Sequence, residues 1–320
     1  MRIGLTVGAG TVDKIVAQAQ RAEADGFTSL WYASSVAGDP LVAMALAGRA
    51  TTSIELGTAV LQTYPCHPLL QANRVAAAAN AMGRPGLTLG LGPSHEPIVR
   101  EVLGLSYERP AQNTREYLQI LSPLLSGAVV DFDGTHWSAH SAGRMAVLDH
   151  PVPVLLSALS PRMLSVAAAL ADGVVLWMAS AAVIADRIAP ILAAATKAHG
   201  KPVPRIVAGL PVAVHDDVGE ARTAVSATAA GYERMVNYQN IIRAGGGSAA
   251  ADVGIVGDED AVARGLTELL DAGATDVWAQ PVAVGTDRDQ RTASLARTRG
   301  LLRDLTREGQ PPPRGRAPRP

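Results

Sequence analysis

A short segment with two alternating glycines and a histidine is the first place where this sequence could carry chemistry. Gly90 and Gly92 alternate in Leu89-Gly90-Leu91-Gly92, and His95 and Glu96 follow shortly after. Glycine on a strand lets a ligand approach the backbone closely, and an imidazole titrates near neutral pH without help from its surroundings. The segment therefore suggests a ligand site with His95 as proton donor. The alternative is a tightly packed strand with His95 on the surface.

A second segment, Ser157-Ala158-Leu159-Ser160-Pro161-Arg162, joins a predicted strand to a predicted helix. Ser160 is a typical N-cap residue, and Pro161 is favoured in the first turn of a helix. The free N–H groups and the positive end of the helix dipole suit a phosphate group, to which Arg162 would add charge. The alternative is an ordinary Ser-Pro cap without a ligand.

Other catalytic patterns are weak or missing. Cys66 lies beside His67, but catalytic pairs of this kind meet in space and rarely in sequence, so we interpret His67 as a loop or cap residue. The sequence contains no G-x-S-x-G motif, no Walker A motif and no cluster of ligands at metal-binding spacing, so we predict no metal site. Few charged residues follow the predicted strands, which favours an organic cofactor that brings its own chemistry.

Composition excludes several classes of protein. Hydrophobic residues make up 48% of the 320 residues and charged residues 18%, which favours a large core over a disordered chain. The net charge of -1 offers no global field to attract nucleic acid or an anionic membrane surface. Cys66 is the lone cysteine, and we find neither a secretion signal nor an apolar run long enough for a membrane span. We therefore expect a cytoplasmic protein.

The elements that would position these residues alternate along the chain. Strands are predicted at 2–7, 28–32, 54–61, 87–91, 152–156, 173–177, 205–214 and 276–282, and helices at 11–25, 40–49, 68–82, 98–103, 111–125, 161–171, 181–199, 216–243 and 290–307. Eight strands each followed by a helix indicate a (β/α)8 barrel. The alternative, a doubly wound sheet with an appended helical domain, is disfavoured because no G-x-G-x-x-G follows the first strand.

Three regions depart from the repeating pattern. Residues 129–137 alternate around Asp133-Gly134 and predict a β-hairpin. The helical region 216–243, after strand seven, is expected to be interrupted at Gly231. Residues 309–320 are too rich in proline and glycine to fold. We therefore expect one barrel domain over 1–308 and a disordered Pro/Arg-rich tail.

Seven segments together resemble the luciferase-like monooxygenase superfamily, and in particular its coenzyme F420-dependent actinobacterial branch. They are RIGLTVG, ADGFTSLWYA, ELGTAVLQTYPCHP, LTLGLGPSHEPIV, LGLSYERPAQNTREYLQIL, VDFDGTHW and PVLLSALSPRMLSVAAALADGVVLWM, and VGDEDAVARGLTELLDAGATDVW matches the closing part of the family. The resemblance is collinear over about residues 1–305. It implies a TIM-like (β/α)8 barrel with a short hairpin insertion, a helical insertion near strand seven, and a deazaflavin at the carboxyl ends of the strands.

The resemblance also implies site residues. A non-prolyl cis peptide under the flavin ring would fall at Ala59-Val60, the phosphate loop at 158–162, and the wall beside the ring at 90–95. The cofactor-binding residues so expected are Gly8, Ser34, Thr58, Ala59, Val60, Gly90, Gly92, His95, Ser157, Ala158, Leu159, Ser160, Pro161, Arg162 and Trp177. His95 is the expected catalytic residue.

These observations favour an oxidoreductase that transfers a hydride between reduced F420 and a small organic substrate. Two alternatives stay open: an FMN-dependent luciferase-like monooxygenase, and a non-catalytic barrel that binds F420 or FMN. We expect no nucleic-acid or membrane partner. A homodimer is expected because the Ala-rich helices leave apolar faces to cover and because family members often dimerise.

Overall fold

The computed structural model describes residues 1–198, 200 and 202–308 of the chain, and the predicted tail over 309–320 lies outside the described residues. Its strands are β1 (Ile3–Thr6), β2 (Ser29–Tyr32), β3 (Glu55–Thr58), β4 (Leu61–Gln62), β5 (Leu87–Gly92), β6 (Asp131–Asp133), β7 (Ser138–His140), β8 (Val154–Leu156), β9 (Gly173–Trp177), β10 (Arg205–Val214), β11 (Ile255–Gly257) and β12 (Asp276–Pro281). Strands buried on both sides, such as β5 and β9, are almost continuously apolar, as parallel strands covered by helices must be.

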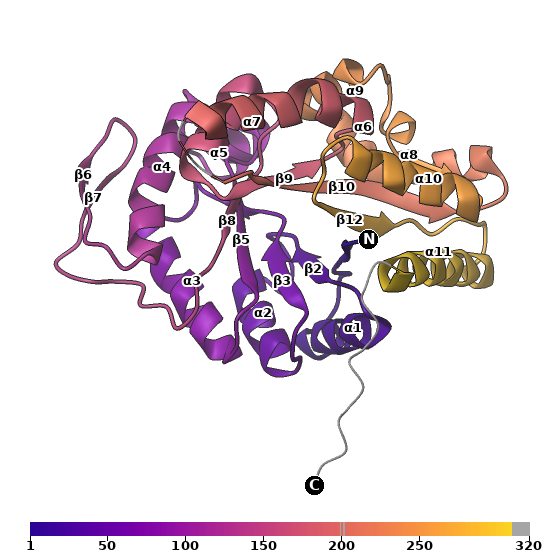
Figure 1. Ribbon diagram of the computed structural model, residues 1–320, viewed down its shortest axis with the longest axis horizontal. Coiled ribbons are helices and arrows are strands. Elements are labelled where there is room, and N and C mark those ends of the chain that lie inside the picture. Colours follow the sequence, from indigo (N-terminus) through magenta and orange to yellow (C-terminus); the bar gives the residue numbers. More distant parts are fainter. Residues whose placement is uncertain (199, 201, 309–320) are drawn as a thin grey trace, which may run out of the picture.

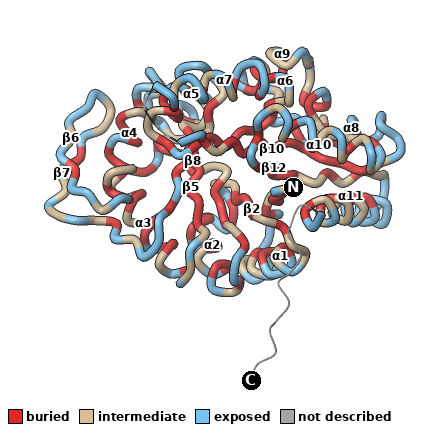
Figure 2. Tube along the Cα trace, viewed as in Figure 1, coloured by how far each residue is buried: buried red, intermediate tan, exposed pale blue. Residues whose placement is uncertain are grey.

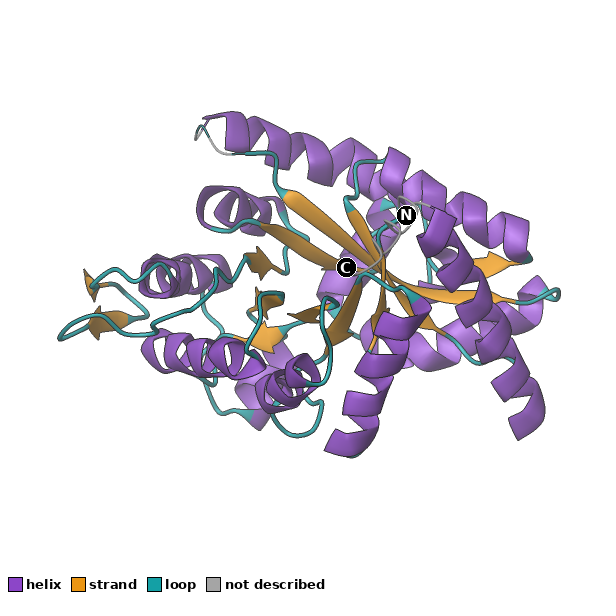
Figure 3. Cartoon of the chain, turned by 60° about the horizontal axis from the view of Figure 1, so that its bottom comes forward, coloured by secondary structure: helices purple, strands orange, loops and turns teal. Residues whose placement is uncertain are grey.

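Parallel pairing closes a barrel. The strands follow the order β10-β12-β1-β2-β3-β5-β8-β9, and β9 pairs with β10 to complete the ring. The register is regular; for example, Leu5 of β1 lies opposite Leu30 of β2 and Ala279 of β12. Figure 3 shows the strands gathered inside a surrounding layer of helices. The predicted TIM-like (β/α)8 fold is confirmed.

Helices cover the outside of the barrel (Figure 1). They are α1 (Val12–Asp25), α2 (Pro40–Arg49), α3 (Pro68–Met82), the π-helix η1 (Ile98–Val102), α4 (Pro110–Leu125), α5 (Pro161–Leu170), α6 (Ala181–Val183), the π-helix η2 (Ile184–Ile188), α7 (Ala189–Ala198), α8 (Val218–Glu233), α9 (Val236–Ala244), the 3₁₀-helix η3 (Ala250–Asp252), α10 (Glu259–Asp271) and α11 (Arg288–Glu308). Their inner faces and the strands form the buried core, whereas their outer faces are exposed (Figure 2).

The structure corrects two sequence-based boundaries. The third predicted strand, 54–61, is divided into β3 and β4, with a cis peptide between Ala59 and Val60. The helical region after β10 breaks after residue 233 and not at Gly231, which lies within α8 and whose position has open space around it. The new helix starts beyond Met235, whose extended backbone acts as its N-cap.

Two further strand regions lie outside the ring of barrel strands. The short strand β11 was not predicted; it pairs with Val212–Val214, the carboxyl end of the long strand β10. The predicted hairpin is present as β6 and β7, paired antiparallel, and it projects from the body beside α3 and α4 (Figure 1). Glu116 of α4 anchors the hairpin by accepting hydrogen bonds from the backbone N–H groups of Thr135, His136 and Trp137.

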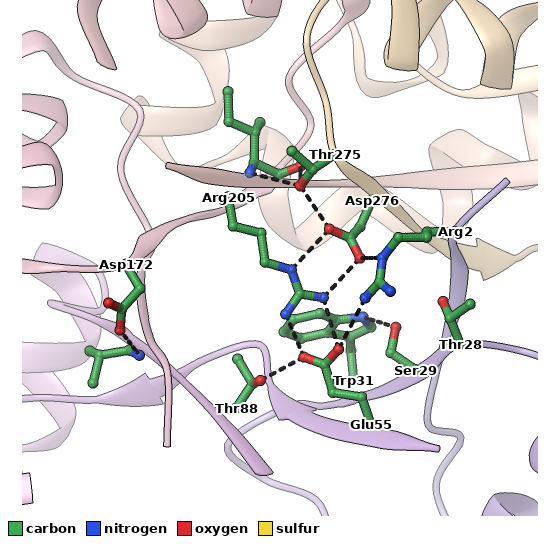
Figure 4. Close-up of polar contacts among 12 residues, drawn as sticks. Arg2, Thr28, Ser29, Trp31, Glu55, Thr88, Asp172, Arg205, Thr275 and Asp276 are labelled. Carbon is green, nitrogen blue, oxygen red and sulfur yellow. Dashed lines mark hydrogen bonds and ion pairs between the residues drawn. The ribbon is translucent and has the colours of Figure 1, made fainter. Parts of the chain in front are cut away.

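A polar cluster closes the amino-terminal end of the barrel (Figure 4). The guanidinium of Arg205 donates to both carboxylate oxygens of Glu55 at 2.6 and 2.9 Å and to those of Asp276 at 2.8 and 2.9 Å. Arg2 donates to Asp276 at 2.7 Å, and Trp31 lies under the Arg205 guanidinium at 5.8 Å from its ring centre. Arg2 precedes β1, and Glu55, Arg205 and Asp276 are the first residues of β3, β10 and β12. The cluster therefore joins these four strands, and Trp31 packs on it from β2.

Candidate cofactor and active site

A large pocket lies at the carboxyl ends of β5 and β8, the end of a (β/α)8 barrel that carries active sites. Its volume is about 1340 Å³, and its walls come from the β5 and β8 ends and from α4, α5, α7 and α9. Ligand pockets for small molecules usually measure about 300–1,000 Å³. This pocket is therefore large enough for a ligand longer than a single ring system.

The glycine segment at the end of β5 forms one wall of the pocket, but its two glycines differ. A Cβ atom at Gly90 would lie 2.0 Å from the carbonyl oxygen of Thr58, so Gly90 is required by the close packing of β5 on β3. The hydroxyl of Thr58 donates to the carbonyl of Gly90 and accepts from its N–H. Gly92 instead lies between Val60 and Ser157, all three of which line the pocket. Of the two glycines, Gly92 is thus the one that lines the pocket.

The expected cis peptide between Ala59 and Val60 is confirmed. It lies between β3 and β4, where the chain leaves its pairing with Tyr32 of β2 and resumes pairing with β5 through Leu61. Val60 reaches the pocket wall, whereas Ala59 does not. Val60 thus adds an apolar side chain to the pocket wall near the third barrel strand.

The segment after β8 forms the helix start that the sequence predicts. Ser160 is the N-cap of α5, Pro161 occupies the first turn, and the Ser160 hydroxyl oxygen accepts a hydrogen bond from the Met163 N–H at 3.4 Å. Ser160, Pro161 and Arg162 line the pocket. Because a hydroxyl that accepts a hydrogen bond keeps its proton for donation, Ser160 can cap the helix and donate to an anion at once. The helix start thus suits an anionic group.

His95 lies in the pocket directly after a sharp backbone turn. Ser94 adopts a left-handed conformation with φ of 62°, which redirects the chain at the end of β5. The His95 ring packs on the ring of Tyr238 of α9, with centroids 5.3 Å apart, and both residues line the pocket. Burial lowers the pKa of His95, so the neutral imidazole is the main form at neutral pH. His95 is therefore poised to accept a proton or to hydrogen-bond a polar substrate atom.

Several buried polar groups at the carboxyl ends of the strands have no hydrogen-bond partner within the described residues. They are Thr6 Oγ1, Tyr32 Oη, Thr63 Oγ1, Tyr64 Oη, Ser94 Oγ and Trp177 Nε1. Buried polar groups in native proteins are almost always paired. Of these residues, Ser94 lines the pocket. A polar ligand such as a flavin or deazaflavin, with ring carbonyl and N–H groups and a hydroxylated chain, would satisfy a group of this kind, so the Ser94 hydroxyl fits such a cofactor.

Eight of the fifteen expected cofactor-binding residues line the pocket, namely Val60, Gly92, His95, Ser157, Leu159, Ser160, Pro161 and Arg162. Gly8, Ser34, Thr58, Ala59, Gly90, Ala158 and Trp177 are not among its lining residues. The N–H of Gly8 is already bonded to the Gln18 side chain, and Trp177 packs on Trp278 with ring centroids 4.9 Å apart. For all fifteen residues, contact with a cofactor stays a prediction.

Sequence reasoning missed several pocket residues that lie on or beside the helices. Arg109 precedes α4, Arg115 lies on α4, Arg187 lies on η2, and Tyr238 lies on α9, and all four line the pocket. The spacing of Arg109, Gln112 and Arg115 places them on one helical face, a signal that the sequence offered. No comparable pattern marked Arg187 or Tyr238, because only the tertiary structure brings α7 and α9 beside α5.

Neither a cluster of metal ligands nor a membrane-spanning helix is found within the described residues. The described part of the chain brings together no group of three or more His, Cys, Asp or Glu side chains able to hold a metal ion. Every helix within residues 1–198 and 202–308 is too short or too polar to cross a lipid bilayer. Cys66 is buried, and the Nδ1 atom of His67 accepts a hydrogen bond from the Leu69 N–H as the N-cap of α3, which confirms the cap interpretation of His67.

Solved structures share this fold. The coenzyme F420-dependent tetrahydromethanopterin reductase from Methanopyrus kandleri aligns with a TM-score of 0.74 and 20% identity over 96% of this chain and 97% of that chain. The FMN complex of the oxygenating constituent of 3,6-diketocamphane monooxygenase from Pseudomonas putida aligns with a TM-score of 0.72 and 16% identity, over 98% and 99% of the two chains. The barrel is therefore shared by enzymes that use either cofactor.

Sequence comparison gives the family. The 5,10-methylenetetrahydromethanopterin reductase of Methanolobus tindarius is 28% identical over 294 residues, which cover 83% of this chain and 89% of that protein. The F420-dependent hydroxymycolic acid dehydrogenase of Mycobacterium tuberculosis is 29% identical over 227 residues, covering 66% and 62% of the two chains. The family model described as luciferase-like monooxygenase matches residues 1–303. The chain therefore belongs to the luciferase-like monooxygenase family.

Proposed function

We propose that this protein is an F420-dependent oxidoreductase that transfers a hydride between the deazaflavin and a small organic substrate. The observation that carries the proposal is the pocket between the ends of β5 and β8, which combines the Val60 and Gly92 wall, the Ser160 helix cap and His95. The names of the relatives from Methanolobus tindarius and Mycobacterium tuberculosis support a reductase or dehydrogenase activity, and the second names F420.

The pocket residues divide into those that would hold the cofactor and one that would handle the proton. Val60 and Gly92 would lie against the ring, and Ser157, Ser160 and Arg162 would hold the phosphate. The reduced deazaflavin, when bound, supplies the hydride, so the protein has to orient the substrate, exclude water and manage one proton. The partly apolar lining of the pocket suits this requirement.

His95 is the group that we propose for the proton. When a substrate alcohol is oxidised, the neutral imidazole accepts the hydroxyl proton as the hydride leaves carbon; when a carbonyl is reduced, the imidazolium returns that proton to oxygen. The lowered pKa of His95, caused by burial, favours the proton-accepting form at neutral pH. Tyr238 packs on the imidazole and would limit its orientation.

A direct titration tests the cofactor assignment. The purified protein is titrated with F420 and, in parallel, with FMN, while the fluorescence of each ligand is followed. We expect F420 to bind more tightly than FMN. Equal or weaker binding of F420 would contradict the proposal, and it would favour the FMN-dependent monooxygenase, which the shared fold with the FMN enzyme of Pseudomonas putida supports.

Turnover separates an enzyme from a binding protein. Reduced F420 bound to the protein should be oxidised by a carbonyl substrate, or oxidised F420 should be reduced by an alcohol, in a screen of small compounds. Tight binding of F420 without turnover of any compound would support the non-catalytic alternative.

We further propose that the protein forms a homodimer through α2 and α3. These neighbouring helices expose Val42, Leu46 and Leu70 at 56%, 48% and 56% of their surface. Large apolar side chains gathered on one face favour a protein contact. Light scattering at micromolar concentration should give twice the mass of one chain, and Leu46→Glu should convert the dimer to monomer. A monomeric wild-type protein would contradict the proposal.

A further inference from the structure

Four arginines line the pocket without forming ion pairs. Arg109, Arg115, Arg162 and Arg187 all contribute to its walls, and none of them forms a salt bridge within the described residues. Other arginines of the chain, such as those in the amino-terminal cluster, are engaged by carboxylates. Asp186 is the lining carboxylate that faces this excess of positive charge.

The arginines come from three separate elements that converge on one space. Arg109 precedes α4 in a left-handed backbone conformation with φ of 49°, and Arg115 lies on α4 itself. Arg162 lies in the first turn of α5, and Arg187 lies on η2. Arg109, Arg162 and Arg187 are exposed, so the basic side of the pocket opens toward solvent. Tertiary packing, and not one charged helix, therefore creates the basic region.

This charge exceeds what a single phosphate requires. The start of α5, with Ser160 and Arg162, is sufficient to hold one phosphate group. Arg109, Arg115 and Arg187 then remain for further anionic groups, and the volume of about 1340 Å³ leaves room for them. A ligand with several carboxylates along a chain fits this surplus, because a guanidinium pairs with carboxylate in a bidentate geometry.

We propose that Arg109, Arg115 and Arg187 form a polycarboxylate-binding site that holds the oligoglutamate tail of F420 beyond its phosphate. The inference rests on the proposed function. With such a site, the protein would distinguish F420 from FMN by the tail and not by the ring, because FMN ends at its phosphate. It also assigns a binding role to residues on the helices outside the strand ends.

The experiment compares ligands that share a ring and differ in their tail. Ring fluorescence is used to measure binding of F420 species with short and long oligoglutamate tails, and of the deazaflavin riboside that lacks both phosphate and tail. The variants are Arg109→Gln, Arg115→Gln, Arg187→Gln and the triple variant. Arg21→Gln is the matched control, because Arg21 is exposed on α1 and lies outside the pocket lining.

Each single variant should weaken F420 binding by about 2–5-fold, as expected for a partly exposed ion pair, and the triple variant by about 10–100-fold. Binding of the riboside should change by less than about twofold, since it makes none of these ion pairs. Wild-type affinity for F420 should fall as salt is raised and should rise with tail length, and both trends should weaken in the triple variant. The Arg21→Gln control should behave as wild type.

Two results would overturn the proposal. If the riboside binds and F420 binds no more tightly at any tail length, the arginines do not hold the tail, although F420-type function would stand. If neither ligand binds, the proposed function fails, and calorimetry with a free γ-linked oligoglutamate then decides the inference. Binding of the peptide to wild type and not to the triple variant would support the polycarboxylate site, and absence of binding would refute it.

Discussion

The two ends of the barrel differ in whether their buried polar groups have partners within the protein. At the amino-terminal end, Arg205, Glu55 and Asp276 satisfy one another through several hydrogen bonds, and the Asp276 side chain is only 2% exposed (Figure 4). At the carboxyl end, buried groups such as Ser94 Oγ and Trp177 Nε1 have no partner within the described residues, and the arginines of the pocket form no ion pairs there.

This contrast separates stability from binding within one fold. A network in which every charge has a partner holds strands together and offers nothing to a ligand. Groups without protein partners cost folding free energy when they are buried, and a ligand with matching groups would recover that cost. In (β/α)8 barrels, the amino-terminal face generally serves stability and the carboxyl face serves function. In this chain the paired cluster lies at the amino-terminal face, whereas Ser94, at the carboxyl face, is an unpartnered group that lines the pocket.

The largest effect that we expect comes from removing the central cation of the closed end. Arg205→Met would leave the carboxylates of Glu55 and Asp276 close together, with Arg2 as the remaining cation of the cluster. Breaking a buried ion-pair network by removing one partner typically costs about 3–5 kcal/mol. Urea denaturation should show this loss in the free energy of unfolding, while the folded fraction should bind cofactor as wild type does.

Arg297→Met is the matched control, because Arg297 pairs with Asp216 and Glu259 on the surface. We expect a loss below about 1 kcal/mol there. The dependence of stability on pH is a second measurement of the Arg205 cluster. Burial opposes ionisation of Asp276, but the hydrogen bond and charge of Arg205 outweigh it and lower the pKa. The stabilisation is thus present above the unfolded pKa of Asp276 and is lost as pH falls through its folded pKa. Equal losses in both variants would contradict the contrast between the ends.

Substituting the two glycines of β5 tests which of them serves packing and which serves cofactor binding. Gly90→Ala would force a Cβ against the Thr58 carbonyl, and we expect a loss near the upper end of about 1–3 kcal/mol in stability. Gly92→Ala would press on Val60 and Ser157 side chains in the pocket wall, so the loss should be near the lower end of about 1–3 kcal/mol. Cofactor affinity should fall mainly in the Gly92 variant. A Gly90 variant as stable as wild type would show that the packing argument is wrong.

How much the sequence revealed depended on whether the signal was local. The helix cap at Ser160 and the glycines of β5 are encoded by neighbouring residues, and both lie in the structure where the sequence placed them. The short strand β11 went unpredicted because its three residues acquire their role only by pairing with the end of β10. Gly231 was a misleading local signal, since an isolated glycine is tolerated inside a helix.

The site shows the same limit. The cis peptide at Ala59-Val60 came from resemblance to a family and not from residue types, because nothing in Thr-Ala-Val-Leu distinguishes cis from trans. Arg109, Arg115 and Arg187 of the pocket were missed because α4 and η2 are far from α5 in the sequence and meet it only after folding. The orphaned groups at the carboxyl end were also invisible, since burial without a partner is a property of the fold.

His95 provides the next test of the carboxyl end. General acid–base catalysis typically contributes about 10²–10⁴-fold, so His95→Ala should lower kcat by at least about 10²-fold and leave cofactor affinity within a few-fold. In the direction of substrate oxidation, wild-type kcat should fall as pH decreases through the pKa of His95, which burial places below its ordinary value. This acid limb should vanish in the variant. His150→Ala, on the exposed segment before β8, is the control and should match wild type. An unchanged kcat in His95→Ala would remove His95 from the mechanism.

The smallest effect, and the sharpest comparison, concerns two serine caps with the same geometry. Ser160 caps α5 and Ser180 caps α6, each accepting a hydrogen bond from a backbone N–H at 3.4 Å, but only Ser160 is among the pocket-lining residues. Replacing either serine with alanine removes a cap, which should cost about 0.5–2 kcal/mol of stability in both variants.

Cofactor affinity should separate the two variants. Ser160→Ala also removes a hydroxyl proton that can be donated to the phosphate, and such a hydrogen bond is worth at least the value of a typical neutral one, about 1 kcal/mol or about fivefold in Kd. Ser180→Ala should leave Kd unchanged. Parallel thermal unfolding and fluorescence titration measure both quantities on the same samples. Because the stability losses are matched, a change in Kd confined to Ser160→Ala places the phosphate at the start of α5, and equal Kd values would move it elsewhere.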